Sequence, residues 1–89
     1  MLEINYFYLG RLSRKNGNLT KALTSFGTSL ELIEGKLGSK YNKSESNRAF
    51  LNNLRAKIYY KISKCHREMG QEEEQISYEN LALKEAGRI

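Results

Sequence analysis

The sequence feature that most restricts the possible folds of this chain is a stripe of apolar residues in its first half. Large apolar side chains recur at steps of four, three, four, three and four: Leu19, Leu23, Phe26, Leu30, Ile33 and Leu37. An α-helix turns once in about 3.6 residues, so this spacing places all of these side chains on one face. The stretch therefore predicts an amphipathic helix that ends near residue 37.

A helix is also predicted before this one, over Leu2–Lys15. Its apolar residues recur at steps of three and four: Ile4, Phe7 or Tyr8, and Leu12. The pattern stops before Gly17, which can adopt the left-handed conformation that ends a helix. Asn18 follows and can cap the next helix through its side-chain oxygen. The two helices are thus predicted to be joined by a sharp turn.

Two more helices are predicted after residues 38–44, whose glycine, serine, asparagine and lysine content is typical of a basic loop. The third runs from Glu45 to Met69, ends at Gly70, and carries one apolar face: Leu51, Leu54, Ile58, Ile62, Cys65 and Met69. The fourth begins with three glutamates, whose carboxylates favour the positive end of the helix dipole, and ends at Gly87. Its apolar residues are Ile76, Leu81 and Leu83.

Length and composition exclude several classes of protein. The 89 residues suffice for one small all-α domain with a thin core, and they include no proline or tryptophan. No apolar run approaches the roughly 18 residues of a membrane span, and the N-terminus lacks the features of a secretory signal. We therefore expect a cytoplasmic or nuclear protein that does not contact membranes.

No set of residues is typical of catalysis or of metal binding. Cys65 is the only cysteine and His66 the only histidine, so the chain has no internal disulfide and no zinc ligand set. Neighbours on a helix point about 100° apart, which suits a thiolate–imidazole pair poorly, and Cys65 belongs to an apolar face. Paired carboxylates, a triad and a phosphate loop are also missing. We expect no enzyme, no cofactor and no metal.

The two halves of the chain are related by an internal repeat. When Gly17 is aligned with Gly70, residues of the same kind coincide: Tyr6 with Tyr59, Leu9 with Ile62, Leu12 with Cys65, Leu23 with Ile76, and Leu30 with Leu83. A period of this kind is typical of repeat proteins, in which each unit is a small group of helices that packs on the next.

The first copy resembles a tetratricopeptide repeat (TPR). The family's pattern of aromatic, Leu-Gly, turn glycine, alanine, aromatic and small or apolar residues is matched by Tyr6, Leu9, Gly10, Gly17, Ala22, Phe26 and Leu30. Small Gly10 and Ala22 allow two antiparallel helices to approach, while Tyr6, Leu9 and Phe26 fill the gaps around that contact. The second copy matches less well: Ser63, Gln75 and Glu79 stand in place of Gly10, Ala22 and Phe26.

This resemblance implies an α-solenoid built of two extended helix pairs. Repeat one spans residues 2–37, a basic loop spans 38–44, and repeat two spans 45–87, all within a single module of residues 1–89. An unrelated four-helix bundle would carry the same apolar stripes. Because solenoids normally need about three repeats, we expect the chain to be a segment of a larger protein.

The resemblance also implies a binding groove lined by the first helix of each pair. The groove positions are Phe7, Arg11, Arg14, Tyr60, Lys64 and Arg67. Arginine and lysine bond carboxylate and phosphate oxygens, so an acidic or phosphorylated peptide is the expected ligand of a scaffold or adaptor module. The plain alternative is a solvated basic helix face. The two-carboxylate clamp of chaperone-binding TPRs is absent, because Phe7 and Arg11 occupy its matching places.

Two rival functions are compatible with the sequence. The chain can be a structural subunit that docks on a partner chain through Tyr59, Tyr78 and Leu81. It can also contact nucleic acid, because residues 1–43 and 44–69 each carry a net charge of +4. Residues 70–89, however, carry −3, and no nucleic-acid-binding motif is present. A protein partner is therefore the leading expectation.

Overall fold

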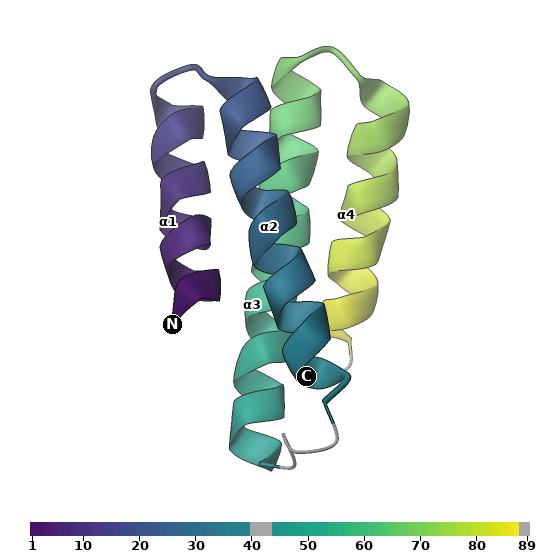
Figure 1. Cartoon of the computed structure of the whole chain (residues 1–89). Helices are drawn as coiled ribbons and strands as arrows, with labels where there is room; N and C mark the ends of the chain where they lie inside the picture. Colours follow the sequence, from purple (N-terminus) through teal and green to yellow (C-terminus); the bar gives the residue numbers. More distant parts are fainter. Residues whose placement is uncertain (40–43, 88–89) are drawn as a thin grey trace.

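The computed structural model describes residues 1–39 and 44–87, and within these ranges it contains four α-helices and no strand. They are α1 (Leu2–Lys15), α2 (Leu19–Leu37), α3 (Glu45–Glu68) and α4 (Glu72–Ala86) (Figure 1). The predicted all-α class and the predicted helices are confirmed, with ends that differ by no more than a residue. Most of the predicted basic loop, residues 40–43, lies outside the described residues.

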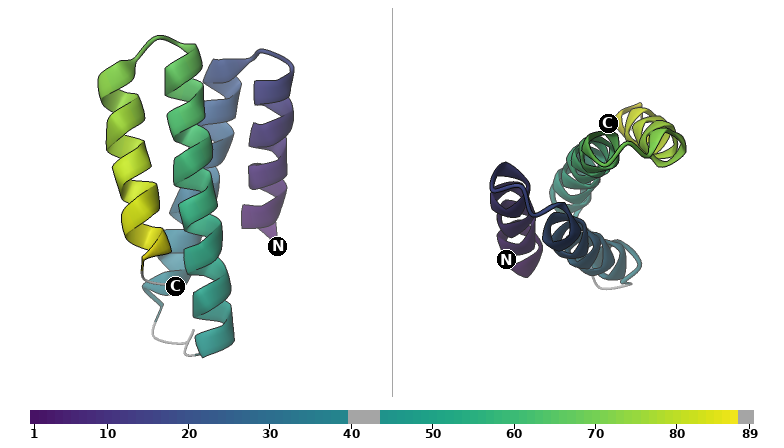
Figure 2. Two further views of the ribbon diagram at one scale, coloured as in Figure 1. Left: turned by 180° about the vertical axis from the view of Figure 1, so that it is seen from behind. Right: turned by 90° about the horizontal axis from the view of Figure 1, so that it is seen from above.

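The helices form two antiparallel hairpins, α1–α2 and α3–α4, whose short turns lie at the same end of the molecule (Figure 1). The hairpins meet where α2 packs against α3, and α1 touches α3 at fewer points. Of the described helices, α4 lies beside α3 alone. Figure 2, seen from above, shows the resulting open row with α1 and α4 at its ends. This row differs from a closed four-helix bundle, in which the first and last helices also meet.

The two short turns have the same geometry. Gly17 and Gly70 have φ angles of 83° and 73°, in the left-handed region that glycine adopts without steric cost. In both turns the residue after the glycine donates its N–H to the carbonyl five residues earlier, at 2.9 Å. The predicted cap is also present, because the Asn18 side chain accepts a hydrogen bond from the Lys21 N–H at 3.1 Å.

The close contact predicted between the first two helices is present. Phe26 is fully buried and faces Gly10, where a Cβ atom would lie only 2.6 Å from the phenyl ring. Ala22 is fully buried beside it, and the ring of Phe7 packs at 6.1 Å from that of Phe26. The small residue on α1 therefore makes room for the aromatic ring on α2, which fills the gap between the helices.

The main core lies between the first hairpin and α3. Its buried members are Phe7, Ala22, Phe26, Ile33, Leu51, Leu54, Ile58, Ile62 and Cys65. The predicted apolar face of α3 is confirmed except for its last member, because Met69 is exposed after the end of the helix. Burial raises the pKa of the Cys65 thiol, as expected for a structural thiol in an apolar core.

The prediction of which apolar residues are buried on α1 and α4 is wrong in part. On α1 the buried residues are Glu3, Phe7, Gly10 and Ser13, whereas Tyr8, Leu9 and Leu12 are exposed. Leu9, predicted to fill a gap in the contact between the helices, is 38% exposed. On α4 the buried residues are Ala82 and Glu85, whereas Ile76, Leu81 and Leu83 are exposed. Both helices contact neighbours on one side only, so their other apolar residues have nothing to cover them.

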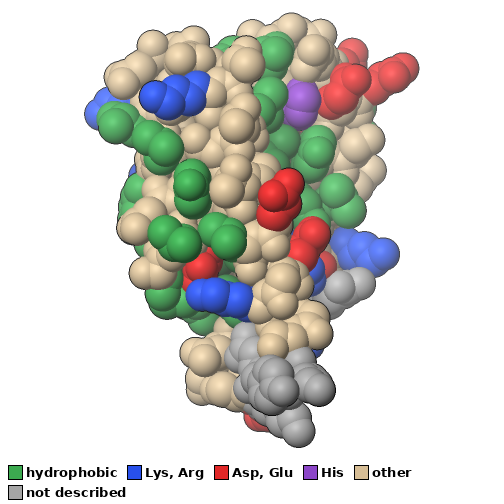
Figure 3. Space-filling model, in the orientation of Figure 1, with side chains coloured by type: hydrophobic (Ala, Val, Ile, Leu, Met, Phe, Trp, Pro, Cys, Tyr) green, Lys and Arg blue, Asp and Glu red, His purple; other side chains and the backbone are tan. Residues whose placement is uncertain are grey.

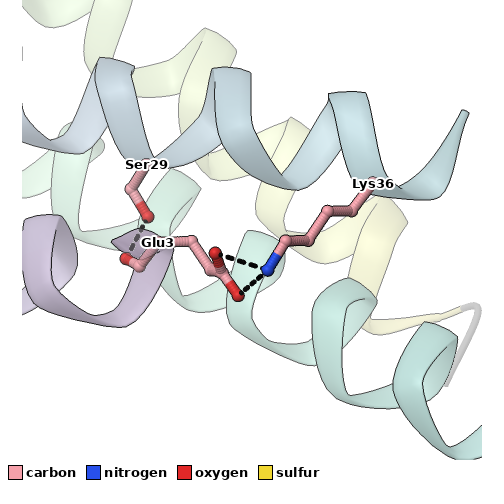
Figure 4. A network of polar contacts seen from close by, with 3 residues as sticks. All are labelled: Glu3, Ser29 and Lys36. Atoms are coloured by element: carbon pink, nitrogen blue, oxygen red, sulfur yellow. Dashed lines mark hydrogen bonds and ion pairs between the residues drawn. The ribbon is translucent and has the colours of Figure 1, made fainter. Parts of the chain in front are cut away.

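A buried polar network also joins the first hairpin, and the sequence pattern did not reveal it (Figure 4). Ser29 donates its hydroxyl to the backbone carbonyl of Glu3 at 2.6 Å, and Lys36 donates to both carboxylate oxygens of Glu3 at 2.8 and 3.0 Å. Burial by itself raises the pKa of Glu3, but the hydrogen bond and charge of Lys36, a backbone hydrogen bond and the charge of the N-terminus together hold that pKa below its ordinary value. The network fixes the start of α1 on α2.

Candidate functional site

A wide groove of about 740 Å³ lies between α1 and α3. Its lining comes from both helices: Tyr8, Arg11, Leu12, Arg14 and Lys15 from α1, and Lys61 and Glu68 from α3. We refer to this hollow as the basic groove. Its charged lining residues are four cations and one carboxylate, so a ligand in it would meet a positive surface.

Helix geometry explains why these residues share one groove. On α1, Tyr8, Arg11, Leu12 and Lys15 are spaced by three, one and three residues, which places them on one side of the helix. On α3, Lys61 and Glu68 are separated by seven residues, or about two turns. Because both hairpin turns lie at the same end, α1 and α3 run in the same direction (Figure 1). The contact between Arg14 and Glu68 joins their C-terminal ends.

Positive charges crowd together at the groove. Burial lowers the pKa of Lys61, and the nearby charges of Lys64, Arg11 and Arg14 lower it further. The neighbouring cations thus add electrostatic repulsion to the larger cost of burying the charged form of Lys61. An anion in the groove would relieve this repulsion, whereas a cation would increase it.

Aromatic rings support two of the cations. The guanidinium of Arg11 lies 5.7 Å from the ring centre of Phe7 and 5.6 Å from that of Tyr8, and these two rings are stacked on each other. The ammonium group of Lys64 lies 4.7 Å above the ring of Tyr60. Contacts of this kind attract the cation to the ring face and restrict the side chain while leaving its donors available.

One ion pair crosses the groove. Arg14 donates to the Glu68 carboxylate at 2.8 Å, so it joins α1 to α3, and both side chains are partly exposed. The Nε atom of Arg14 is buried and has no hydrogen-bond partner among the described residues. The guanidinium is therefore only partly satisfied by the protein, which is a costly state for a donor away from water.

The six predicted groove residues differ in where the structure places them. Arg11 and Arg14 line the basic groove, and Lys64 is close enough to affect the pKa of Lys61 in it. Phe7, expected to face a ligand, is instead buried against Phe26, because α1 turns this side of the helix toward α2.

The last two predicted residues lie elsewhere on α3. Tyr60 lines a different hollow, between α3 and α4, and Arg67 is exposed in the last turn of the helix. The alignment missed five lining residues: Tyr8, Leu12, Lys15, Lys61 and Glu68. Tyr8 and Lys15 follow from Arg11 by helical spacing of three and four residues, and Leu12 follows from Tyr8 in the same way.

The hollow that Tyr60 lines is apolar and measures about 480 Å³. Its walls include the small side chains of Ala56, Ala82 and Ala86 and the edge of Glu79. In the repeat alignment Glu79 corresponds to Phe26, the ring that fills the equivalent space in the first hairpin. The second hairpin lacks such a ring, so a space remains between its helices.

The residues expected to dock a structural subunit are mostly engaged within the chain. The rings of Tyr59 and Tyr78 lie 6.1 Å apart, and Tyr78 also stacks on His66 at 5.4 Å. These contacts hold α4 against α3. Leu81 is the exposed member of the predicted set.

Comparison with protein-family models, curated proteins and solved structures found no match. No helix in the described part of the chain combines the length and apolar character needed to cross a bilayer. Within the same residues, no three histidine, cysteine or acidic side chains converge in a way that would hold a metal ion.

Proposed function

We propose that the chain is a non-catalytic protein interaction module that binds an acidic or phosphorylated peptide segment in the basic groove. The observation that carries the proposal is the convergence of Arg11, Arg14, Lys15 and Lys61 from two parallel helices. Lys64 lies near enough to add its charge. The mutual repulsion of these cations is relieved by a bound anion, and their donors suit the oxygen atoms of carboxylates and phosphates.

The groove also suits a peptide better than a small ion. Its volume of about 740 Å³ extends along two helices, and its lining combines cations with the apolar surfaces of Tyr8 and Leu12. Ligand sites of this mixed kind use apolar area for affinity and a few polar groups for orientation. An extended segment with alternating acidic and apolar side chains matches this lining.

We further propose a TPR-like α-solenoid as the architecture, in a scaffold or adaptor of the cytoplasm or nucleus and as a segment of a larger protein. Three features support it: the two hairpin turns are alike, Gly10 receives Phe26, and the helices form an open row. In such a row the first helices of successive hairpins lie side by side, as α1 and α3 do around the groove.

The experiment is a fluorescence anisotropy titration with a labelled peptide of alternating glutamate and leucine, compared with the same peptide carrying glutamine. Replacement of Arg11 and Lys61 by glutamine should weaken binding of the acidic peptide by about tenfold or more, since each charged hydrogen bond contributes about 1.5–3 kcal/mol. A peptide with phosphoserine in place of glutamate tests the phosphorylated class.

The matched control removes the same charge elsewhere. Lys21 and Lys84 are exposed on α2 and α4, outside the groove, and their replacement by glutamine should leave the affinity within about twofold at moderate salt. Equal losses in the groove variant and the control would show a general charge effect and contradict the proposal. Tighter binding of a single-stranded RNA than of the acidic peptide would favour nucleic acid instead.

A further inference from the structure

The two ends of the helix row expose apolar side chains whose counterparts in the internal repeat are buried or partly buried. On α1, Leu9 is 38% and Leu12 is 55% exposed, and Leu12 also borders the basic groove. Their counterparts in the repeat, Ile62 and Cys65 on α3, are buried in the core that α3 shares with the first hairpin. The same face is therefore covered in the second hairpin and open in the first.

The exposed apolar residues of α4 follow the same pattern. Ile76 is 48% and Leu83 is 71% exposed, and Leu83 also borders the hollow between α3 and α4. Their counterparts on α2, Leu23 and Leu30, pack against the core between α2 and α3. Within the chain, the two hairpins pack together through α2 and α3. The exposed residues of α4 correspond to the α2 side of this contact, and those of α1 correspond to the α3 side. Figure 3 shows hydrophobic side chains on both the α1 flank and the α4 flank of the molecule.

The charges of the two end helices are complementary. α1 carries three basic side chains, which border the basic groove, and one buried glutamate. α4 carries one lysine and five glutamates, of which Glu72, Glu73 and Glu74 are exposed in the first turn and Glu85 is buried. Pairing α4 with α1 therefore brings opposite charges together, while pairing α4 with α4 or α1 with α1 brings like charges together. Charge thus favours contact between different ends over contact between identical ends.

We propose that a second copy of this chain docks head to tail, with the exposed apolar face of α4 on the exposed apolar face of α1. The interface is heterologous, because each copy contributes a different surface, and it leaves a free face at each end of the pair. Association is therefore open-ended and increases with concentration. The contact repeats between chains the packing that α2 and α3 make within one chain.

The test uses one disrupting change on each face of the 89-residue chain. Leu9→Glu places a charge on the α1 face, and Leu83→Glu places one on the α4 face; both positions are exposed, so the fold should be retained. Ser46→Glu, at an exposed position at the start of α3, is the charge-matched control. Sedimentation velocity gives the mass of each sample, and circular dichroism checks that helicity is unchanged.

The expected masses follow from the geometry. The wild type and the Ser46→Glu control should exceed the monomer mass of 10.3 kDa as concentration rises, and each single-face variant should remain at 10.3 kDa. An equimolar mixture of Leu9→Glu and Leu83→Glu chains should form pairs of twice that mass and nothing larger. In such a pair the intact α4 face of one chain meets the intact α1 face of the other.

Three results would overturn the proposal. A wild type that stays monomeric at all concentrations would show that the faces do not bind each other. Self-association retained by either single variant would indicate a symmetric contact through one face. A mixture of the two variants that stays monomeric would exclude pairing between the unlike faces.

Discussion

Replacement of Gly10 by alanine tests whether close packing of α1 on α2 determines the stability of the first hairpin. A Cβ atom at this position would lie 2.6, 2.7 and 3.0 Å from Cε1, Cδ1 and Cγ of Phe26. The ring is fully buried and held by its neighbours, so it cannot move aside without disturbing the core. The helices must separate or the ring must leave its preferred position.

Two opposing terms set the size of the effect. Forcing an extra methyl group into a well-packed core typically costs about 1–3 kcal/mol. Alanine is favoured over glycine in a helix interior by about 0.5–1 kcal/mol. The expected net result for Gly10→Ala is therefore a loss of about 1 kcal/mol in the free energy of unfolding. For a domain of this size such a loss lowers Tm by about 4–8 °C.

Gly27 provides the control, because it lies inside α2 and a Cβ atom there would meet nothing within 4 Å. Gly27→Ala should raise the free energy of unfolding by about 0.5–1 kcal/mol through helix propensity alone. Urea unfolding followed by circular dichroism measures both variants. If Gly10→Ala were as stabilising as Gly27→Ala, the two helices would not be in close contact at Gly10.

Three further predictions concern buried polar groups. The pKa of Glu3 is lower in the folded protein than in the unfolded chain, so its ionised carboxylate contributes to the free energy of unfolding. This stabilisation is present above the unfolded pKa of about 4.3 and is lost as pH falls through the folded pKa. Glu3→Gln should therefore cost about 1–2 kcal/mol at neutral pH and progressively less in acid, whereas a difference that did not change with pH would argue against the pair with Lys36. Glu85 on α4 pairs with Arg55 on α3 at 2.9 Å, and their side chains are only 8% and 16% exposed. Glu85→Ala leaves Arg55 without this carboxylate and should cost about 3 kcal/mol, compared with less than about 1 kcal/mol for Glu68→Ala in the more exposed pair with Arg14. Equal costs in urea unfolding would contradict this. The thiol of Cys65 should react with a disulfide reagent only slowly in the native protein and rapidly in denaturant, and fast labelling of the native chain would show that α3 is not packed as described.

Local signals in the sequence determined the helices and the turns between them. Gly17 and Gly70 end helices because only glycine adopts positive φ freely, and the stripes of α2 and α3 carry enough apolar residues to identify their buried faces. The pairing of small Gly10 with large Phe26 was also predictable, because their sizes are complementary and a short turn brings their helices together.

The candidate site was only partly predictable. Arg11 and Arg14 were identified, but Phe7 was assigned to the groove and is buried in the core. Residues three and four apart share a side of a helix, yet spacing alone does not show which side meets a neighbour. Lys61 was missed because its place in the groove depends on how α3 lies beside α1.

The sequence by itself determined where this chain is helical, because helix propensity, apolar period and turn glycines act over a few residues. Only the tertiary structure decided which faces of α1 and α4 are covered, since each lies at an end of the row and contacts neighbours on one side. Positions that correspond in the repeat thus differ in burial: Leu23 and Leu30 on α2 pack against the core, whereas Ile76 and Leu83 on α4 are exposed. Burial depends on contacts between residues far apart in the chain, and no local pattern contains that information.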